Sequence, residues 1–230
     1  MNEQYKVQVQ NLVDDLKAVF THAGLGGEAG EYKLLTQSFL YKFLNDKFLY
    51  EAQDVDSENT YDRLVSMSEE DYDWLLEDIG TSTAWMKPNQ FIETLHRKQN
   101  ESDFYETFEN TLNQIAIDNN DIFSVHTDGD TAIRLFDERL ITDTISDSSK
   151  RNEVAKAIIN LLARVKFDET IFSQGFDFFS TLFEYMIKDY NKDGGGKYAE
   201  YYTPHSVAKI IADILVGNDQ PRSEEHTSEL

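Results

Sequence analysis

Cysteine is absent from this chain of 230 residues, and proline occurs only three times. Without cysteine, neither a disulfide framework nor a thiolate metal site can form. No apolar run approaches the roughly 18 residues that a membrane-spanning helix needs. The first residues also lack the basic and apolar regions of a secretory signal. We therefore expect a cytoplasmic protein that does not enter a membrane.

Basic side chains are also scarce, since the chain has 21 lysines and arginines against 43 aspartates and glutamates. The formal net charge of -22 repels a DNA backbone, because affinity for phosphate comes from neutralising it with basic groups. This segment is therefore not expected to form the main DNA-binding face of an assembly. Its hydrophobic content of 40%, with 15 phenylalanines and 12 tyrosines, is ample for a core.

Apolar residues recur at helical spacing over most of the chain, which predicts a mainly α fold. Gly24, Gly26 and Gly27 end the first helix in a helix–helix turn. Ser68 and Asp71 form a capping box before another helix. Helices are expected over residues 5–20, 31–50, 72–79, 88–95, 151–165 and 172–190, with loops at 51–66 and 125–130. The second of these helices is apolar on several sides, so it is expected to be central.

A further helix is expected to begin at Thr203 and Pro204. Threonine is a good N-cap, and proline suits the first helical position because its missing N–H costs nothing there. Free N–H groups of a first helical turn attract a carboxylate or phosphate, and the rings of Tyr201 and Tyr202 can pack beside a ligand. One apolar stripe follows, made of Val207, Ile210, Ile211, Ile214 and Leu215. This pattern predicts either a ligand-facing helix start or simply a capped core helix.

Short segments spread in order along the chain carry a resemblance to a known family. They are Glu31-Tyr32-Lys33, Phe39-Leu40-Tyr41-Lys42-Phe43-Leu44-Asn45-Asp46, Ile133-Arg134-Leu135-Phe136-Asp137, Arg151-Asn152-Glu153, Phe183-Glu184-Tyr185-Met186-Ile187 and Glu200-Tyr201-Tyr202-Thr203-Pro204-His205-Ser206-Val207. Together they resemble the M subunits of type I restriction-modification systems, which are adenine-specific DNA methyltransferases that use S-adenosylmethionine.

The resemblance implies a helical N-terminal domain over residues 1–168 and the first helices of a truncated Rossmann-like α/β methyltransferase domain over 169–221. It implies that S-adenosylmethionine contacts Glu200, Tyr201, Tyr202, Thr203, Pro204 and His205. Ala199 stands where many relatives have glycine, which affects the backbone just before this pocket. The implied partners are a specificity (S) subunit, a restriction (R) subunit, and DNA bound through the assembled complex.

The family's catalytic Asn-Pro-Pro-aromatic segment does not occur in this sequence, whose prolines are Pro88, Pro204 and Pro221. No catalytic residue is therefore assigned. Residues 222–230 are polar, lack periodicity and resemble the translation of a sequencing adapter, so they are expected to be an artefact. The alternative is an acidic tail. On the adapter interpretation, the chain is an N-terminal fragment that is inactive alone.

Other interpretations stay open. Residues 189–200 fit the spacing of a calcium-binding EF-hand loop, although Gly196 replaces the usual apolar anchor and Pro204 interrupts the exit helix. Residues 24–29 fit a loose dinucleotide fingerprint, but they follow a helix where a strand is required. The histidines have no paired ligand spacing, so no metal site is expected. In function, the rival is a non-catalytic acidic helical module that binds proteins or mimics DNA.

Overall fold

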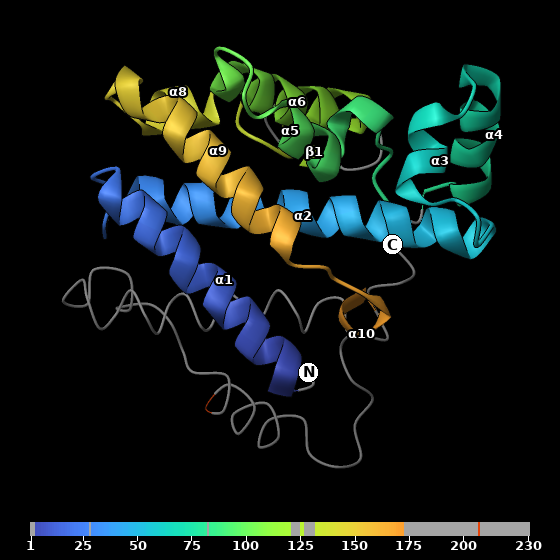
Figure 1. Cartoon of the computed structure of the whole chain (residues 1–230), viewed down its shortest axis with the longest axis horizontal. Coiled ribbons are helices and arrows are strands. Elements are labelled where there is room, and N and C mark those ends of the chain that lie inside the picture. The colour runs from blue at the N-terminus through green and yellow to red at the C-terminus, as the bar shows by residue number, and fades with distance from the viewer. Residues whose placement is uncertain are drawn as a thin grey trace. The chain divides into compact units, whose positions relative to one another are not determined.

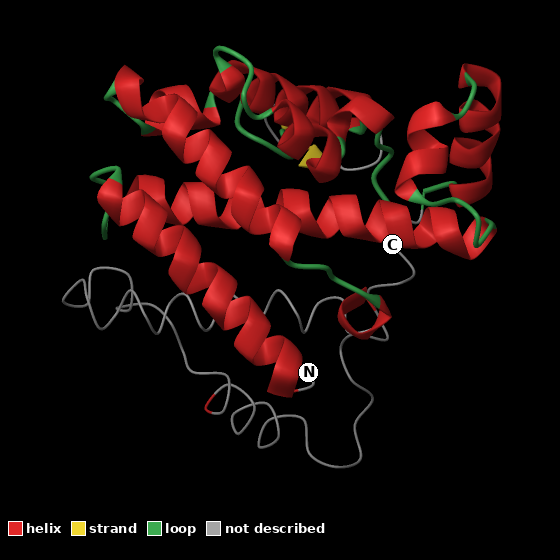
Figure 2. Ribbon diagram, in the orientation of Figure 1, coloured by secondary structure: helices red, strands yellow, loops and turns green. Residues whose placement is uncertain are grey.

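A long helix, α2 (Ala29–Val55), runs through the middle of the helical unit in this computed structural model (Figure 1). The structure describes residues 3–27, 29–81, 83–120, 125–126, 132–172 and Val207. Within these residues the fold is mainly helical, as the sequence predicts (Figure 2). The chain divides into two units, Met1–Met186 and Ile187–Leu230. All described residues except Val207 belong to the first unit.

The described elements follow one another in a simple order. They are α1 (Glu3–His22), α2, α3 (Tyr61–Ser66), α4 (Glu69–Ile79), a 3-10 turn (Pro88–Gln90), α5 (Ile92–Lys98), α6 (Phe104–Asp118), β1 (Val125–His126), β2 (Ala132–Ile133), α8 (Leu140–Thr144), α9 (Ser148–Arg164) and α10 (Glu169–Phe172). The two strands form an antiparallel pair, with Val125 opposite Ile133. None of the helices in these ranges combines the length and apolarity required to span a membrane.

Helix α2 is buried on several sides, which confirms its predicted central position. Helices α1, α4, α8 and α9 all pack against it. Polar residues that are buried on such a helix normally find hydrogen-bond partners within the protein. Its buried residues include Glu31, Ser38, Lys42, Asn45 and Asp46 as well as apolar ones.

Helix α9 forms the second axis of the core. It packs against α1, α5 and α6 and contacts α2 and α8 (Figure 1). Val154, Ile158 and Leu162 lie on its buried face, with spacings of four residues. The predicted helix over 151–165 is confirmed, with its start moved to Ser148 because Asp147 accepts the backbone N–H of Ser149 and caps the first turn.

Predictions for two helix boundaries are confirmed in atomic detail. Gly24 and Gly27 have φ angles of 95° and 74°, a region that glycine adopts without a steric penalty. The turn between α1 and α2 therefore needs glycine at both positions. At α4, the hydroxyl oxygen of Ser68 accepts the backbone N–H of Asp71 and the hydroxyl donates to the Asp71 carboxylate at 2.6 Å. The expected capping pair is thus present.

The prediction of a loop over 51–66 is wrong. Helix α2 continues to Val55, and α3 begins at Tyr61 after Thr60 accepts the backbone N–H of Arg63. Pro88 opens only a 3-10 turn, and the α-helix starts at Ile92 because Phe91 takes an extended conformation. The expected loop at 125–130 contains strand β1 at its start. Helices α6 and α8 were not predicted.

Several predictions concern residues outside the described ranges. They include most of the helix at 172–190, the Rossmann-like domain, the candidate calcium loop, the apolar stripe apart from Val207, and residues 222–230. The boundary at 168/169 stays a prediction. Val207 has helical backbone, in agreement with a helix after Pro204, and its side chain is 43% exposed.

Candidate functional site

The six predicted cofactor residues, Glu200, Tyr201, Tyr202, Thr203, Pro204 and His205, lie outside the described residues. Their arrangement therefore stays a prediction from sequence. The described unit nevertheless contains segments on which the resemblance rests. Their contacts show what those residues do in the helical unit.

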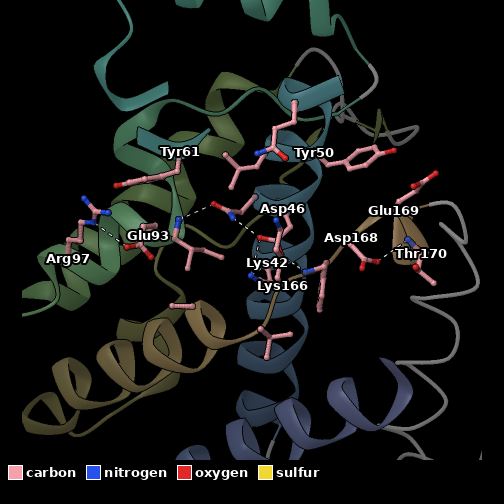
Figure 3. Close-up of a pocket in the computed structure, with 17 residues that line it drawn as sticks. Lys42, Asp46, Tyr50, Tyr61, Glu93, Arg97, Lys166, Asp168, Glu169 and Thr170 are labelled. Carbon is pink, nitrogen blue, oxygen red and sulfur yellow. Dashed lines mark hydrogen bonds and ion pairs between the residues drawn. The ribbon is translucent and has the colours of Figure 1, made fainter. Parts of the chain in front are cut away.

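A cavity of about 600 Å³ opens between α2, α5 and the linker from α9 to α10 (Figure 3). Its lining includes both acidic and basic side chains: Lys42, Asp46, Glu93, Arg97, Lys166, Asp168 and Glu169. The linker, residues 165–168, joins α9 to α10, the last described helix before residue 173.

Asp46 is the centre of a buried hydrogen-bond network beside this cavity. Its carboxylate lies 2.8 Å from the ammonium of Lys42, one helical turn earlier. It also accepts the side-chain amide of Asn45 at 2.8 Å and the backbone N–H of Phe167 at 2.7 Å. Because both side chains of the ion pair are at most 6% exposed, each charge depends on the other and on these hydrogen bonds.

The buried ion pair affects the protonation of Lys42. Burial lowers the pKa of the Lys42 ammonium, and the neighbouring Asp46 carboxylate offsets part of that effect. The ammonium also lies 5.7 Å from the centre of the Phe167 ring. Lys42 therefore faces the linker through the Phe167 ring, while its charge is balanced by Asp46 on its own helix.

Asn45 connects α2 to the beginning of α5. Its side-chain carbonyl accepts the backbone N–H of Ile92 at 2.9 Å, and Ile92 is the first residue of α5. The residue before it, Phe91, provides no side-chain cap. Asn45 therefore satisfies a first-turn donor from another helix. Nearby, the hydroxyl of Tyr41 donates to the carbonyl of Gln90 at 2.6 Å.

Charged side chains at the outer edge of the cavity also form ion pairs with one another. Arg97 lies 4.8 Å from the centre of the Tyr61 ring, and its guanidinium is 3.1 Å from Glu93 and 3.7 Å from Asp62. Among the described residues, no group of three or more His, Asp or Glu side chains is arranged to hold a metal. The charges around the cavity thus compensate one another. We call such a place, where side-chain hydrogen bonds or ion pairs connect two elements, a joint.

The segment Ile133–Asp137, quoted for the resemblance, forms a second joint through Asp137. Its carboxylate accepts the amide of Gln37 at 2.6 Å and lies 2.7 Å from the ammonium of Lys33. Its backbone N–H donates to the side-chain amide oxygen of Gln37 at 3.0 Å. This pairing fixes the chain before α8 against α2.

The resemblance segment at the start of α9, residues 151–153, joins α9 to two neighbouring helices. Arg151 donates to the carbonyls of Ile145 and Thr142 at the end of α8. Asn152 accepts the backbone N–H of Tyr105 in the first turn of α6. Glu109 of α6 in turn accepts the backbone N–H and hydroxyl of Thr142. The resemblance segments in the described unit are therefore joints between helices.

Asn45 and Asp46 belong to a segment that carries the resemblance, but the sequence did not predict their hydrogen bonds to Ile92 and Phe167. A signal was available, because Lys42, Asn45 and Asp46 are polar residues within a helix that is apolar on several sides. Lysine and aspartate four residues apart can pair along a helix. The partner Phe167, however, is 121 residues away, and no local pattern indicates it.

Comparison with known proteins adds information about the C-terminal segment. Residues 174–227 match the model of the N-6 DNA methylase family. The match contains all six predicted cofactor residues and supports a relationship to adenine DNA methyltransferases. It covers less than half of the 230 residues. No curated protein and no solved structure matches the chain.

Proposed function

We propose that this chain is the N-terminal part of the M subunit of a type I restriction-modification system. The observation that carries the proposal is the N-6 DNA methylase match over residues 174–227, which includes Glu200–His205. The ordered resemblance segments in the helical unit support the narrower assignment. The proposed partners are a specificity subunit and a restriction subunit, with DNA bound through the assembled complex.

The proposed reaction is methyl transfer from S-adenosylmethionine to the exocyclic amino group of adenine. The amino nitrogen attacks the methyl carbon, the carbon–sulfur bond breaks, S-adenosylhomocysteine leaves and the nitrogen loses a proton. Access to the amino group requires the adenine to be flipped out of the duplex. The 230-residue sequence has no Asn-Pro-Pro segment to hold that adenine, so this chain alone supplies no complete catalytic site.

The residue types at 200–205 fit the cofactor. A helix beginning at Thr203 offers free N–H groups to its carboxylate, and Tyr201 and Tyr202 offer ring faces to its sulfonium. The proposed task of this chain is therefore to form one wall of the cofactor pocket. The helical unit, with its joints at Asp46, Asp137 and Arg151, precedes this wall in the sequence.

Photo-crosslinking tests the cofactor assignment. Irradiation of the purified chain with methyl-labelled S-adenosylmethionine should label a peptide that contains residues 200–205. An excess of S-adenosylhomocysteine should prevent labelling, and ATP should not. Tyr202→Ala should abolish labelling, whereas the matched control Tyr198→Ala should retain it. Labelling that is absent, or that S-adenosylhomocysteine does not reduce, contradicts the proposal.

The rival function, a non-catalytic acidic interaction module, predicts no specific labelling at all. Sequencing of the gene is a second measurement that distinguishes the proposed function from the rival. On our proposal the locus encodes a glycine-rich loop and an Asn-Pro-Pro-aromatic segment after the codon for Val216. A stop codon directly after the codon for Leu230 favours the rival.

A further inference from the structure

The segment that follows α9, residues 165–172, lies on α2 as a strap. It consists of the linker and α10, and we call it the strap. Only two of its eight side chains, those of Phe167 and Ile171, are buried. Residues 165–170 line the cavity of about 600 Å³, so this side of the strap faces open space (Figure 3). Segments that bury few apolar side chains are among the first parts of a fold to open.

Two contacts anchor the strap to α2. At one, the backbone N–H of Phe167 donates to the carboxylate of Asp46 at 2.7 Å. At the other, the ring of Phe172 lies against the rings of Phe43 and Tyr50, with centroid distances of 5.6 and 5.3 Å. Both contacts are made with a single helix, so they can be lost together while α9 stays packed on its neighbours.

The hydrogen bonds of α10 lie within the strap. The backbone N–H groups of Ile171 and Phe172 donate to the carbonyl of Asp168. The carboxylate of Asp168 accepts the backbone N–H of Thr170 at 3.0 Å. None of these bonds involves α2, so separation of the strap from α2 does not itself break them.

Separation of the strap also leaves no unpaired charge on α2. Asp46 keeps its partners Lys42, at 2.8 Å, and Asn45, because all three residues belong to this helix. Water that enters from the adjacent cavity can replace the N–H of Phe167 as a donor to Asp46. The large penalty for a buried charge without its partner is therefore avoided.

We propose that the strap opens and closes on α2 while the helical unit stays folded. In the closed state, Phe167 is bonded to Asp46 and Phe172 lies on Phe43 and Tyr50. In the open state these contacts are lost and the cavity widens. In sequence, the strap directly precedes residues 174–227, which match the N-6 DNA methylase family. Opening thus adds eight residues, up to roughly 26–29 Å when extended, to the connection between α9 and that segment.

Native-state amide hydrogen exchange of the complete 230-residue chain, measured by nuclear magnetic resonance in low concentrations of urea, tests this proposal. Local opening exposes little surface, so exchange of the Phe167 amide should depend only weakly on urea. The amides of Ile158 and Leu162, in the buried face of α9, should exchange at least about tenfold more slowly. Their exchange should show the urea dependence of global unfolding.

Two variants identify the contact that closes the strap. Phe172→Ala should speed up exchange of the Phe167 amide about two- to tenfold, the range expected for aromatic contacts, and leave Ile158 and Leu162 unchanged. The matched control Tyr61→Ala removes an aromatic ring from α3 at the same cavity. It should not change the exchange rate of Phe167.

Three results would overturn the proposal. One is exchange of the Phe167 amide with the rate and urea dependence of Ile158 and Leu162. Another is equal acceleration of all three amides by Phe172→Ala, and the third is equal acceleration of Phe167 by Phe172→Ala and Tyr61→Ala. The measurement contains no S-adenosylmethionine, so its outcome is independent of the proposed methyltransferase function.

Discussion

The carboxylate of Asp46 accepts the backbone N–H of Phe167, 121 residues further along the chain, at 2.7 Å. The same carboxylate pairs with Lys42, and both side chains are buried. Removing Asp46 alone leaves a buried ammonium without its counter-charge. Asp46→Ala should therefore lower the free energy of unfolding by about 3–5 kcal/mol. Urea denaturation at neutral pH measures the change.

Two further variants test whether the unpaired charge causes this loss. The double variant Lys42→Met, Asp46→Leu removes both charges and should recover much of the stability. The exposed pair of Glu93 and Arg97 is the matched control, and Glu93→Gln should change stability by less than about 1 kcal/mol. Equal losses in Asp46→Ala and the double variant would contradict the electrostatic explanation.

Because Tyr41 and Tyr72 are buried, we expect the protein to lose stability at alkaline pH. Burial raises the pKa of Tyr41 well above 10.0 and also raises the pKa of Tyr72. Their hydroxyls donate to the carbonyls of Gln90 and Met86. Because the folded pKa is the higher one, this stabilisation is complete below about pH 10, the ordinary pKa of a tyrosine in an unfolded chain, and it declines above that pH as the unfolded tyrosines ionise.

The expected decline approaches about 1.4 kcal/mol per pH unit for each such tyrosine. The double variant Tyr41→Phe, Tyr72→Phe should be less stable at neutral pH but should lose less stability above pH 10. Lys42 changes stability in the opposite direction. Because its pKa is lowered on folding, the free energy of unfolding rises as the pH increases toward its unfolded pKa of 10.5. Thermal denaturation over this pH range measures both. Parallel declines in wild type and variant would refute the prediction.

Gly30, near the start of α2, lies against Thr144 at the end of α8, with no room for a larger side chain. A Cβ atom at this position would lie 2.6 Å from the methyl group of Thr144. Gly30→Ala should therefore destabilise the protein by about 1–3 kcal/mol, because a packed side chain has to move. Thr144→Ser removes that methyl group and should restore most of the loss in the double variant. Additive effects in denaturant unfolding would contradict the contact.

Local patterns account for the parts of the fold that depend on neighbouring residues. The capping pair of Ser68 and Asp71, the glycine turn at Gly24 and Gly27, and the buried stripe of α9 are all confirmed. The errors occur where tertiary contacts decide. Phe91 separates the turn at Pro88 from α5, and Asn45 on another helix satisfies the first donor of α5. Sequence periodicity contains no information about such a distant cap.

The candidate site divides in the same way. Residues 200–205 were predicted from a helix-start pattern and a resemblance, and the N-6 DNA methylase match now includes them. Their contacts stay predictions. The network at Asp46 could not be predicted, because its partner Phe167 lies 121 residues away in the sequence.

The central position of α2 has a consequence for synthesis on the ribosome. Gln37 on this helix reaches its partner Asp137 only after another 100 residues have been made. At about 5–20 residues per second, that interval is roughly 5–20 s. During this time the apolar sides of α2 lack α8 and α9 as cover. The nascent chain should therefore depend on chaperones until α9 has emerged.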